Sequence, residues 1–359
     1  MDPLTQGLLG AVTAQLGFRR GIGRDASWVA AAAAVAADLD SFAAPVLQSM
    51  GYGDDLAGLV LHRGVSHSLL AVPVIALVFA WPWWGIRRKL AAGRDPPGTP
   101  PPFRLLYACT LVAALSHPLL DLLTSYGIQL LAPITDTRYA IDVVAIIDVF
   151  YTGILALTLA ACGLTYLVGS RPWRAMLVAA WIGFALSCAY LAAGRLLHDR
   201  AVRIARRLAG GETIVRADAY PYLGSILLWR SVVETPHRWI VTRVHHLRDF
   251  SADPARSAVV PKVDNQWTRA ARTLPEFSVY NWFAMGRIRA THERRGGEQV
   301  VEFHDMRYSA DPGGVGSLWP LRVTFDAAGK VRGVRRIFAF RKRRSAGLIR
   351  KAWRELWTP

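Results

Sequence analysis

Cysteine is scarce in this chain of 359 residues, and the few cysteines present do not form a motif. All three lie inside apolar runs, at Cys109, Cys162 and Cys188. No two of them have the spacing of a metal or redox pair, and buried free cysteine behaves as a small apolar residue. The sequence therefore predicts three core residues and no disulfide bonds.

Positive charge is absent from the first stretch, "MDPLTQGLLGAVTAQLGF", which contains Asp2 and no Lys or Arg. A secretory signal peptide carries basic residues ahead of its apolar core, so this stretch is expected to be retained. Internal repeats are missing as well. No paired hydropathy repeat of the kind that builds many transporters is visible.

Apolar residues, by contrast, make up 52% of the chain, and the mean hydropathy is +0.23. The net charge of +17 is unevenly spread. Residues 1–194 contain 12 Lys and Arg against 11 Asp and Glu, whereas residues 195–359 contain 31 against 15. The sequence predicts a helical transmembrane domain over residues 1–194 and a basic soluble domain over residues 195–359.

Six stretches are apolar enough, and about long enough, to be candidate membrane spans. They are residues 3–18, 28–48, 68–86, 105–124, 148–168 and 175–194. The first is short and glycine-rich, so it suits either a short span or a re-entrant helix. The expected fold of this domain is therefore α-helical, with five to six spans.

The loops between these stretches alternate in charge. Lys and Arg are concentrated in the loops around residues 19–24, 87–104 and 171–174. The positive-inside rule places these loops in the cytoplasm, and the N-terminus and basic domain on the outer side. The same orientation gathers polar residues toward the outer face: Gln6, His62, His67, His117, Asp121, Asp142 and Asp148.

The basic half has a different pattern. An amphipathic helix is expected from residue 195 to the glycine pair at 210–211. The stretch "ILLWRSVVETPHRWIVTRVHHL" predicts a hairpin, and "EQVVEFHDMRYS" and "LWPLRVTFDAAGKVRGVRRIFAF" predict further strands. We expect a small α+β domain, mainly of antiparallel strands. The tail "RKRRSAGLIRKAW" is a candidate basic helix.

The motif "SHPLLDLLTSYG" places His117 and Asp121 four residues apart, on one face of a helix. That spacing suits two ligands of one metal ion, or a ligand histidine with a nearby carboxylate. The alternative is that the two side chains hydrogen-bond to each other within a helix bundle and bind no metal. Pro118 removes one backbone donor and favours a kink or a helix start.

Asp38 and Asp40 lie in "ADLDS", within an apolar span, where a carboxylate is costly unless it is paired, hydrated or metal-bound. On a regular helix they point to nearly opposite sides. Both can face one site only if the helix breaks there. The sequence predicts that Asp38 or Asp40 is a ligand and does not decide which.

Two histidines flank an arginine in "HRGVSHS". His62 and His67 suit a loop followed by a helix, where they are either surface residues or ligands. Arg63 beside them suits an anionic group such as phosphate. Further along, one of Asp142 and Asp148 is expected to orient a ligand imidazole and the other to cap a helix. Gln6 is a further candidate to support the ligands from outside.

These residues converge on one expected face of the membrane domain. Imidazole and carboxylate together suit a divalent metal such as zinc. A metal there would lower the pKa of bound water and supply a nucleophile for hydrolysis.

Five co-linear motifs carry a resemblance to a known family. "MDPLTQGLLGA", "ADLDS", "HRGVSHSLL", "SHPLLDLLTSYGIQLLAP" and "IDVVAIIDVFYT" resemble the YdjM-like family of bacterial membrane-bound, metal-dependent hydrolases over about residues 1–170. That family is distantly similar to zinc-dependent phospholipase C. The resemblance implies phosphoester hydrolysis at the inner membrane, with a metal held by Asp38 or Asp40, His62, His67, His117 and Asp121.

One position departs from the family pattern. The opening motif usually reads Asp-Pro-x-Thr-His-Gly, and this chain has Gln6 in place of the histidine. An amide is a poorer zinc ligand than imidazole, so one metal position is expected to be weakened, shifted or lost.

The first hypothesis is a membrane-bound hydrolase of a phosphoester or lipid-linked substrate near the outer face, using metal-activated water, with Asp121 and Arg63 in catalytic roles. The second is a non-catalytic scaffold that retains the fold, which Gln6 favours. The third is a transporter, which the clustering of polar residues at one face disfavours. No nucleic-acid partner is expected for a domain outside the cell, and the sequence does not indicate an oligomeric state.

Overall fold

The computed structural model describes residues 1–50, 56–93, 98–168, 172–248 and 257–338. The chain divides into two compact units. The first comprises Met1–Ala43, Leu61–Ile141 and Ile146–Ala193, and the second comprises Ala44–Val60, Asp142–Ala145 and Gly194–Pro359. The main division therefore falls where the hydropathy and charge of the sequence change, while two short segments group with the second unit.

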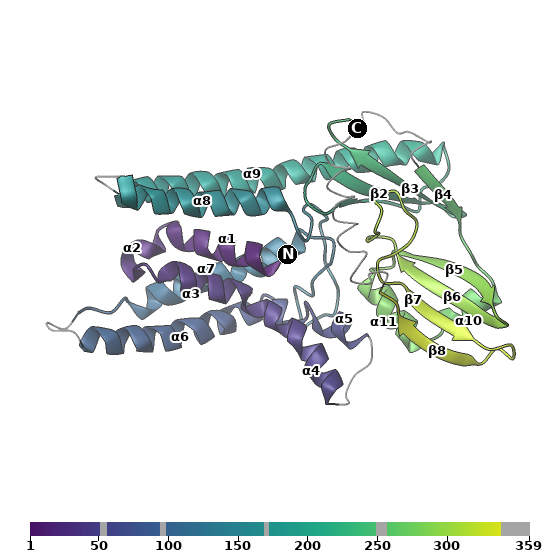
Figure 1. Cartoon of the computed structure of the whole chain (residues 1–359), viewed down its shortest axis with the longest axis horizontal. Coiled ribbons are helices and arrows are strands. Elements are labelled where there is room, and N and C mark those ends of the chain that lie inside the picture. The colour runs from purple at the N-terminus through teal and green to yellow at the C-terminus, as the bar shows by residue number, and fades with distance from the viewer. Residues whose placement is uncertain (51–55, 94–97, 169–171, 249–256, 339–359) are drawn as a thin grey trace. The chain divides into compact units, whose positions relative to one another are not determined.

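The first unit is helical (Figure 1). It consists of α1 (Pro3–Gln15), α2 (Phe18–Ile22), α3 (Ala26–Val35), the 3-10 helices η1 (Ala36–Phe42) and η2 (Val65–His67), α6 (Ala71–Ala92), α7 (Phe103–Leu122), α8 (Val149–Val168) and the first part of α9 (Pro172–Arg206). Helix α1 packs against α3, α7 and α8, and α7 also packs against α3 and α6. A core of alanines with Leu106 and Cys109 lies between these helices.

Helices α1 and α3 lie close together because small side chains face each other. A Cβ atom added to Gly10 would lie 2.5 Å from the Cβ of Ala34 and 2.7 Å from the carbonyl oxygen of Ala30. Small residues of this kind allow helix backbones to approach within a membrane. The contact fixes the position of Ala34, whose carbonyl oxygen contacts His117.

Replacing Gly10 with alanine is expected to destabilise the first unit by about 1–3 kcal/mol, because the added methyl group must push α1 and α3 apart. The thermal unfolding midpoint of the protein in detergent measures this. Gly153→Ala is the matched control, since a Cβ atom at Gly153 meets nothing within 4 Å. Equal midpoints for the two variants would contradict the packing argument.

The expectation of five to six spans is not confirmed. By length and composition, three helical segments among the described residues could cross a membrane: Ala26–Ser49, Phe103–Leu122 and Trp173–Ala209. A fourth is possible if Ala57–His67 and Ala71–Ala92, bent by 71° relative to each other, form one broken span. Val149–Thr165 is apolar but shorter, and α1 has only 13 residues.

The predicted last span and the predicted amphipathic helix form one continuous helix, α9, of 35 residues. It ends in a short 3-10 turn, η3 (Arg207–Ala209), followed by Gly210 in the left-handed conformation. The glycine pair thus ends the helix as expected, because glycine adopts this conformation without steric cost.

The second unit contains two four-stranded antiparallel sheets (Figure 1). The first has the order β1 (Arg216–Pro221), β2 (Leu228–Glu234), β3 (Arg238–His245) and β4 (Ser257–Pro261), and the second has β5 (Ile288–Arg295), β6 (Glu298–Asp305), β7 (Leu321–Phe325) and β8 (Val331–Arg336). The hairpin predicted around "ETPH" is confirmed as β2–β3, in which Glu234 pairs with Trp239. The two later strand segments form β6 and the β7–β8 hairpin.

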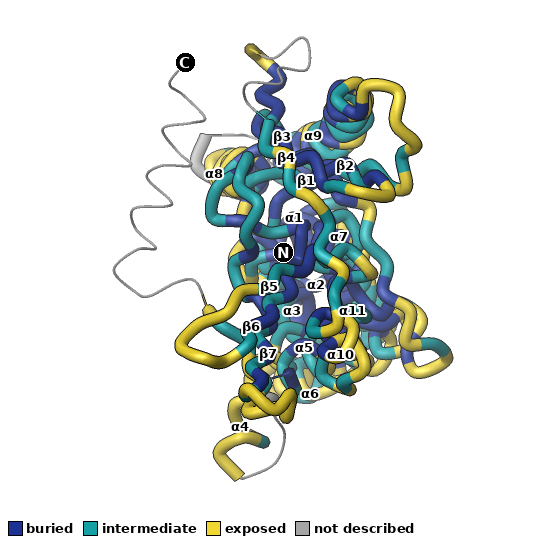
Figure 2. The backbone as a smooth tube through the Cα atoms, turned by 90° about the vertical axis from the view of Figure 1, so that its right-hand side faces the viewer, coloured by how far each residue is buried: buried dark blue, intermediate teal, exposed yellow. Residues whose placement is uncertain are grey.

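Four short helices also belong wholly or largely to this unit: α4 (Ala43–Ser49), α5 (Ala57–Leu61), α10 (Gln266–Arg272) and α11 (Pro275–Phe283). Figure 2 shows that α4 is exposed over most of its length. Between the sheets, the buried Arg230 donates hydrogen bonds to the carbonyl oxygens of Met306 and Gly314. The predicted basic tail helix lies outside the described residues.

Candidate metal centre

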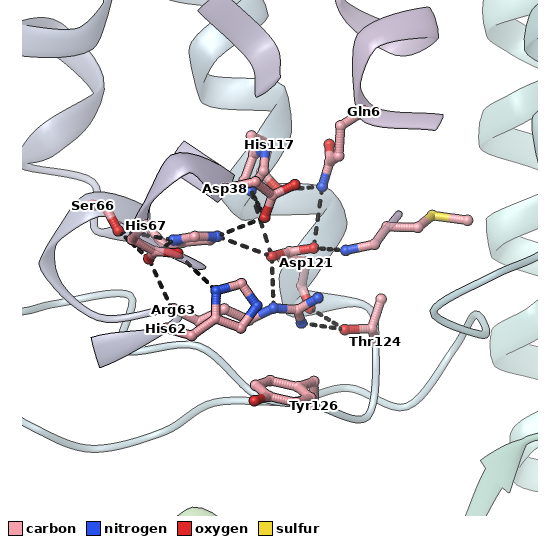
Figure 3. Close-up of polar contacts among 12 residues, drawn as sticks. Gln6, Asp38, His62, Arg63, Ser66, His67, His117, Asp121, Thr124 and Tyr126 are labelled. Carbon is pink, nitrogen blue, oxygen red and sulfur yellow. Dashed lines mark hydrogen bonds and ion pairs between the residues drawn. The ribbon is translucent and has the colours of Figure 1, made fainter. Parts of the chain in front are cut away.

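Three elements of the first unit bring polar side chains to one point (Figure 3). The 3-10 helix η1 carries Asp38 and Asp40, η2 carries His67, and α7 carries His117 and Asp121. The α3 helix changes to 3-10 geometry just before Asp38. Residues two apart then stand about 120° apart around the axis, compared with about 160° in an α-helix. This break allows Asp38 and Asp40 to contact the same imidazole, His67.

One ligand atom from each of Asp38, His67, His117 and Asp121 lies within 4.8 Å of the others. His67 Nε2 is 3.4 Å from Asp38 Oδ1 and 3.5 Å from Asp121 Oδ2. His117 Nε2 is 3.6 Å from each of the same two oxygens. Four ligands placed around a tetrahedral zinc at its usual bond lengths stand about 3.3–3.4 Å apart. The spacing of this four-residue cluster therefore fits one ion at its centre.

The backbone and a carboxylate determine the tautomers of the two histidines. His117 Nδ1 lies 2.6 Å from the carbonyl oxygen of Ala34, which can only accept, so Nδ1 carries the hydrogen. His67 Nδ1 likewise faces Asp40 Oδ2 at 3.1 Å. In both rings Nε2 points into the cluster, and it has a lone pair there when the imidazole is neutral. Metal-binding histidines in proteins are usually oriented in this way.

Several buried atoms of the cluster lack a hydrogen-bond partner. Four side-chain atoms of the cluster are buried without a hydrogen-bond partner among the described residues: Asp38 Oδ2, His67 Nε2, His117 Nε2 and Asp121 Oδ2. Leaving a buried polar atom unsatisfied costs about 1–3 kcal/mol. The oxygen of Asp38 that faces both imidazoles is Oδ1, and Arg63 lies beside Asp121 Oδ2. With neutral imidazoles, Asp38 Oδ1, His67 Nε2, His117 Nε2 and Asp121 Oδ2 are all acceptors, which a cation would satisfy together. The residues present therefore fit a divalent metal ion.

The two oxygens of Asp121 face different partners. Oδ1 accepts a hydrogen bond from Gln6 Nε2 at 3.1 Å and contacts the α-amino group of Met1. Gln6 Nε2 also lies 3.4 Å from the carbonyl oxygen of His117. Gln6 thus orients Asp121 from outside the four-residue cluster, while Oδ2 faces inward.

Asp40 and His62 form a hydrogen-bonded pair beside the cluster. His62 Nδ1 is 2.7 Å from Asp40 Oδ1, and Asp40 Oδ2 accepts from Ser66 Oγ at 2.5 Å and from the Arg63 backbone N–H at 3.1 Å. A second possible ligand group combines Asp40, His62 and His67. The carboxylate of Asp40 is already saturated by donors, so it suits a positioning role better than metal binding. Of the two aspartates that the sequence left open, Asp38 lies in the four-residue cluster.

Arg63 is buried beside Asp121 and has a left-handed backbone, with a φ of 62°. Its Nε lies 3.1 Å from Asp121 Oδ2, and Nη1 donates to Thr124 Oγ1 at 2.9 Å. The guanidinium stacks over the ring of Tyr126, with 4.6 Å between the guanidinium carbon and the ring centroid. Its positive charge offsets part of the negative charge of the two cluster carboxylates, Asp38 and Asp121.

A cavity of about 550 Å³ opens next to this arrangement. Its polar wall is formed by Asp2, Asp38, Ser41, His62, Arg63 and Tyr126. Its apolar wall consists of Val35, Leu39, Phe42, Ile146 and Ile147, with Pro3 at the start of α1. A small molecule in this cavity would contact both the cluster and an apolar surface.

The other two candidate aspartates have different surroundings. Asp148 caps α8, because Oδ1 accepts from the backbone N–H groups of Phe150 and Tyr151. The hydroxyl of Tyr190 also donates to it, at 2.8 Å. Asp142 belongs to the second compact unit and has a left-handed φ of 60°. Neither is in the four-residue cluster.

Sequence reasoning missed three contributors. The role of the Ala34 carbonyl oxygen cannot be read from the sequence, because every residue has a backbone carbonyl. Thr124 and Tyr126 lie within the quoted motif "SHPLLDLLTSYG" but were not distinguished from a helix end. Their spacing from Asp121 by three and five residues offered a weak signal that they share its surroundings.

Comparison with known proteins adds one finding. The model of the family described as YdjM inner membrane protein matches residues 1–200, which contain all the residues of the cluster. Searches of curated proteins and of solved structures found no match. The matched region covers more than half of the chain and agrees with the ordered motifs of the sequence. The chain belongs to the YdjM inner membrane protein family.

Proposed function

We propose that this membrane protein is a metal-dependent hydrolase of a phosphoester or lipid-linked substrate. The observation that carries the proposal is the convergence of two carboxylates and two imidazoles, with one ligand atom of each within 4.8 Å of the others and with no hydrogen-bond partner for either imidazole Nε2 among the described residues. Asp38, His67, His117 and Asp121 would hold the ion, and two imidazoles with two carboxylates suit zinc. With four protein ligands, the ion would need a fifth coordination position for water. It would then lower the pKa of that water and stabilise charge that develops on a phosphoryl oxygen.

The chain's own residues supply the remaining roles. Because Asp40 fixes the hydrogen of His62 on Nδ1, Nε2 is the atom that can take a proton from the attacking water. The water oxygen forms a bond to phosphorus, and the P–O bond to the leaving group breaks. His62 then returns the proton to the leaving oxygen. Arg63, on the same cavity wall, is positioned to face the anionic group of the substrate.

Removal of the metal tests this proposal. Chelation by EDTA is expected to abolish hydrolysis of bis(p-nitrophenyl) phosphate and of a lipid phosphate by the purified protein. Zinc is expected to restore the hydrolysis. Asp38→Asn should remain inactive after zinc is added, while Asp264→Asn, at an exposed aspartate, should respond as wild type does.

The non-catalytic scaffold is the alternative, and the same assay distinguishes the two. Gln6 favours it, because an amide stands where the family pattern has a histidine. Against it, Gln6 donates to Asp121 and leaves the four-residue cluster intact. A protein that binds zinc and hydrolyses neither substrate would favour the scaffold.

We also propose that the protein sits in the bacterial inner membrane with six spans and with its C-terminal domain on the outer side. The alternation of Arg-rich loops supports this orientation. Alkaline phosphatase fused after residue 359 is expected to be active, because the enzyme matures only outside the cytoplasm. A fusion at residue 90 is the matched control and should be inactive. The reverse pattern would overturn the orientation.

A further inference from the structure

The cavity beside the cluster has a polar inner end and an apolar outer rim. Asp38, His62 and Arg63 line the inner end. Leu39, Phe42 and Ile147 line the rim, and their exposed fractions are 61%, 66% and 50%. These three rim side chains remain open to their surroundings at the point where the cavity opens. We define them as the apolar rim.

Helix lengths place this cavity within the hydrocarbon layer. Arg24 and Arg104 mark the charged ends of α3 and α7. Asp38 lies 14 residues beyond the first and Asp121 lies 17 beyond the second, which correspond to about 21–26 Å of helix. The hydrocarbon core of a bilayer is about 30 Å thick. The cluster therefore lies near the far edge of that layer, at a depth that lipid chains reach.

The charge at the inner end suits an anionic head group. Two carboxylates, Asp38 and Asp121, lie beside the guanidinium of Arg63. Asp2 and Asp40 add two further carboxylates, and Met1 adds an α-amino group. A bound divalent ion would balance these charges, and the ion and Arg63 would be the cationic contacts for a ligand. A ligand that satisfies both ends carries a negatively charged head and a hydrocarbon chain.

We infer that the cavity binds a membrane-resident phosphoester whose head lies at the cluster and whose hydrocarbon chain lies on the apolar rim of Leu39, Phe42 and Ile147. The choice of head group rests on the proposed function. The proposed binding surface for the hydrocarbon chain rests on the geometry of the rim alone. The rim makes the protein select long-chain substrates over short, water-soluble phosphoesters.

Photolabelling tests the inference without turnover. The probe is a C16 alkyl phosphonate with a diazirine on its chain, added to the full-length protein in lipid nanodiscs with zinc. Its C–P bond is not hydrolysed. Labelled peptides identified by mass spectrometry are expected to contain residues 39–42 or 146–147. The labelling yield of the double variant Leu39→Ser/Phe42→Ser is expected to be at least five-fold lower than that of wild type.

Val78→Ser is the matched control, because Val78 is 60% exposed on α6 and does not line the cavity. It should label as wild type does. Labelling spread evenly over α6 and the rim, or unchanged in the double variant, would overturn the inference. A C16 alcohol with the same diazirine separates the two claims: if the alcohol labels the rim as strongly as the phosphonate does, the rim binds the hydrocarbon chain, and the proposed recognition of the head group is refuted.

Discussion

Purified wild-type protein is expected to contain one equivalent of zinc per chain, and His117→Ala is expected to contain less than a tenth of that. His117 supplies one of four inward-facing ligand atoms, and its Nε2 is oriented by the carbonyl oxygen of Ala34. With three ligands left, the open position admits water and the ion dissociates more readily. Metal analysis of the protein after gel filtration measures this directly.

His237→Ala is the control for that experiment, because His237 is exposed in the β2–β3 turn. It should keep the wild-type metal content. Unfolding provides a competing explanation for metal loss in His117→Ala, so its thermal midpoint is compared with that of wild type stripped by EDTA. Wild-type protein without metal, or His117→Ala with a full equivalent, would refute the metal centre.

The second large effect is expected for His62→Gln, which should lower the rate of hydrolysis by about 10²–10⁴-fold, the usual contribution of a general base. Glutamine can still hydrogen-bond to Asp40 and cannot take up a proton. Since His62 lies outside the four-residue cluster, metal content is expected to be unchanged. Loss of rate with retained zinc is the signature of proton transfer rather than of metal binding.

Steady-state hydrolysis and metal analysis on the same preparation check this prediction. If His62→Gln loses zinc in parallel with activity, His62 is a ligand, as the family resemblance implies, and the Asp40–His62 pair has another function. If it keeps both zinc and activity, the proton-transfer role is wrong. His237→Gln controls for the general effect of replacing a histidine.

The sequence indicated which residue types gather at the site better than how they are arranged. The i, i+4 spacing of His117 and Asp121 correctly placed both on one helix face, with Nε2 and Oδ2 3.6 Å apart. Pro118 does not start a new helix, because α7 continues through it to Leu122. A proline inside a helix is tolerated in membrane domains, where neighbouring groups satisfy the freed carbonyl.

Hydropathy was a weaker guide to the number of spans. It treats each apolar run as one straight helix, whereas the run at 28–48 contains the 3-10 segment η1 and the run at 68–86 follows a 71° bend. Both irregularities lie beside the cluster, at Asp38 and at His67. The departures from regular α-helix are therefore found where polar groups gather at the cluster.

By itself, the sequence determined that an apolar helical half precedes a basic β-rich half, that the β2–β3 and β7–β8 hairpins form, and that His117 and Asp121 share one helix face. These features depend on local periodicity, charge and spacing. Only the tertiary structure placed Asp38, and not Asp40, in the four-residue cluster and Gln6 beside Asp121. It also showed that Ala34 orients His117. Those outcomes depend on close contact between α1, α3 and α7, which no local pattern specifies, because backbone carbonyls and side-chain rotamers act across helices far apart in the chain.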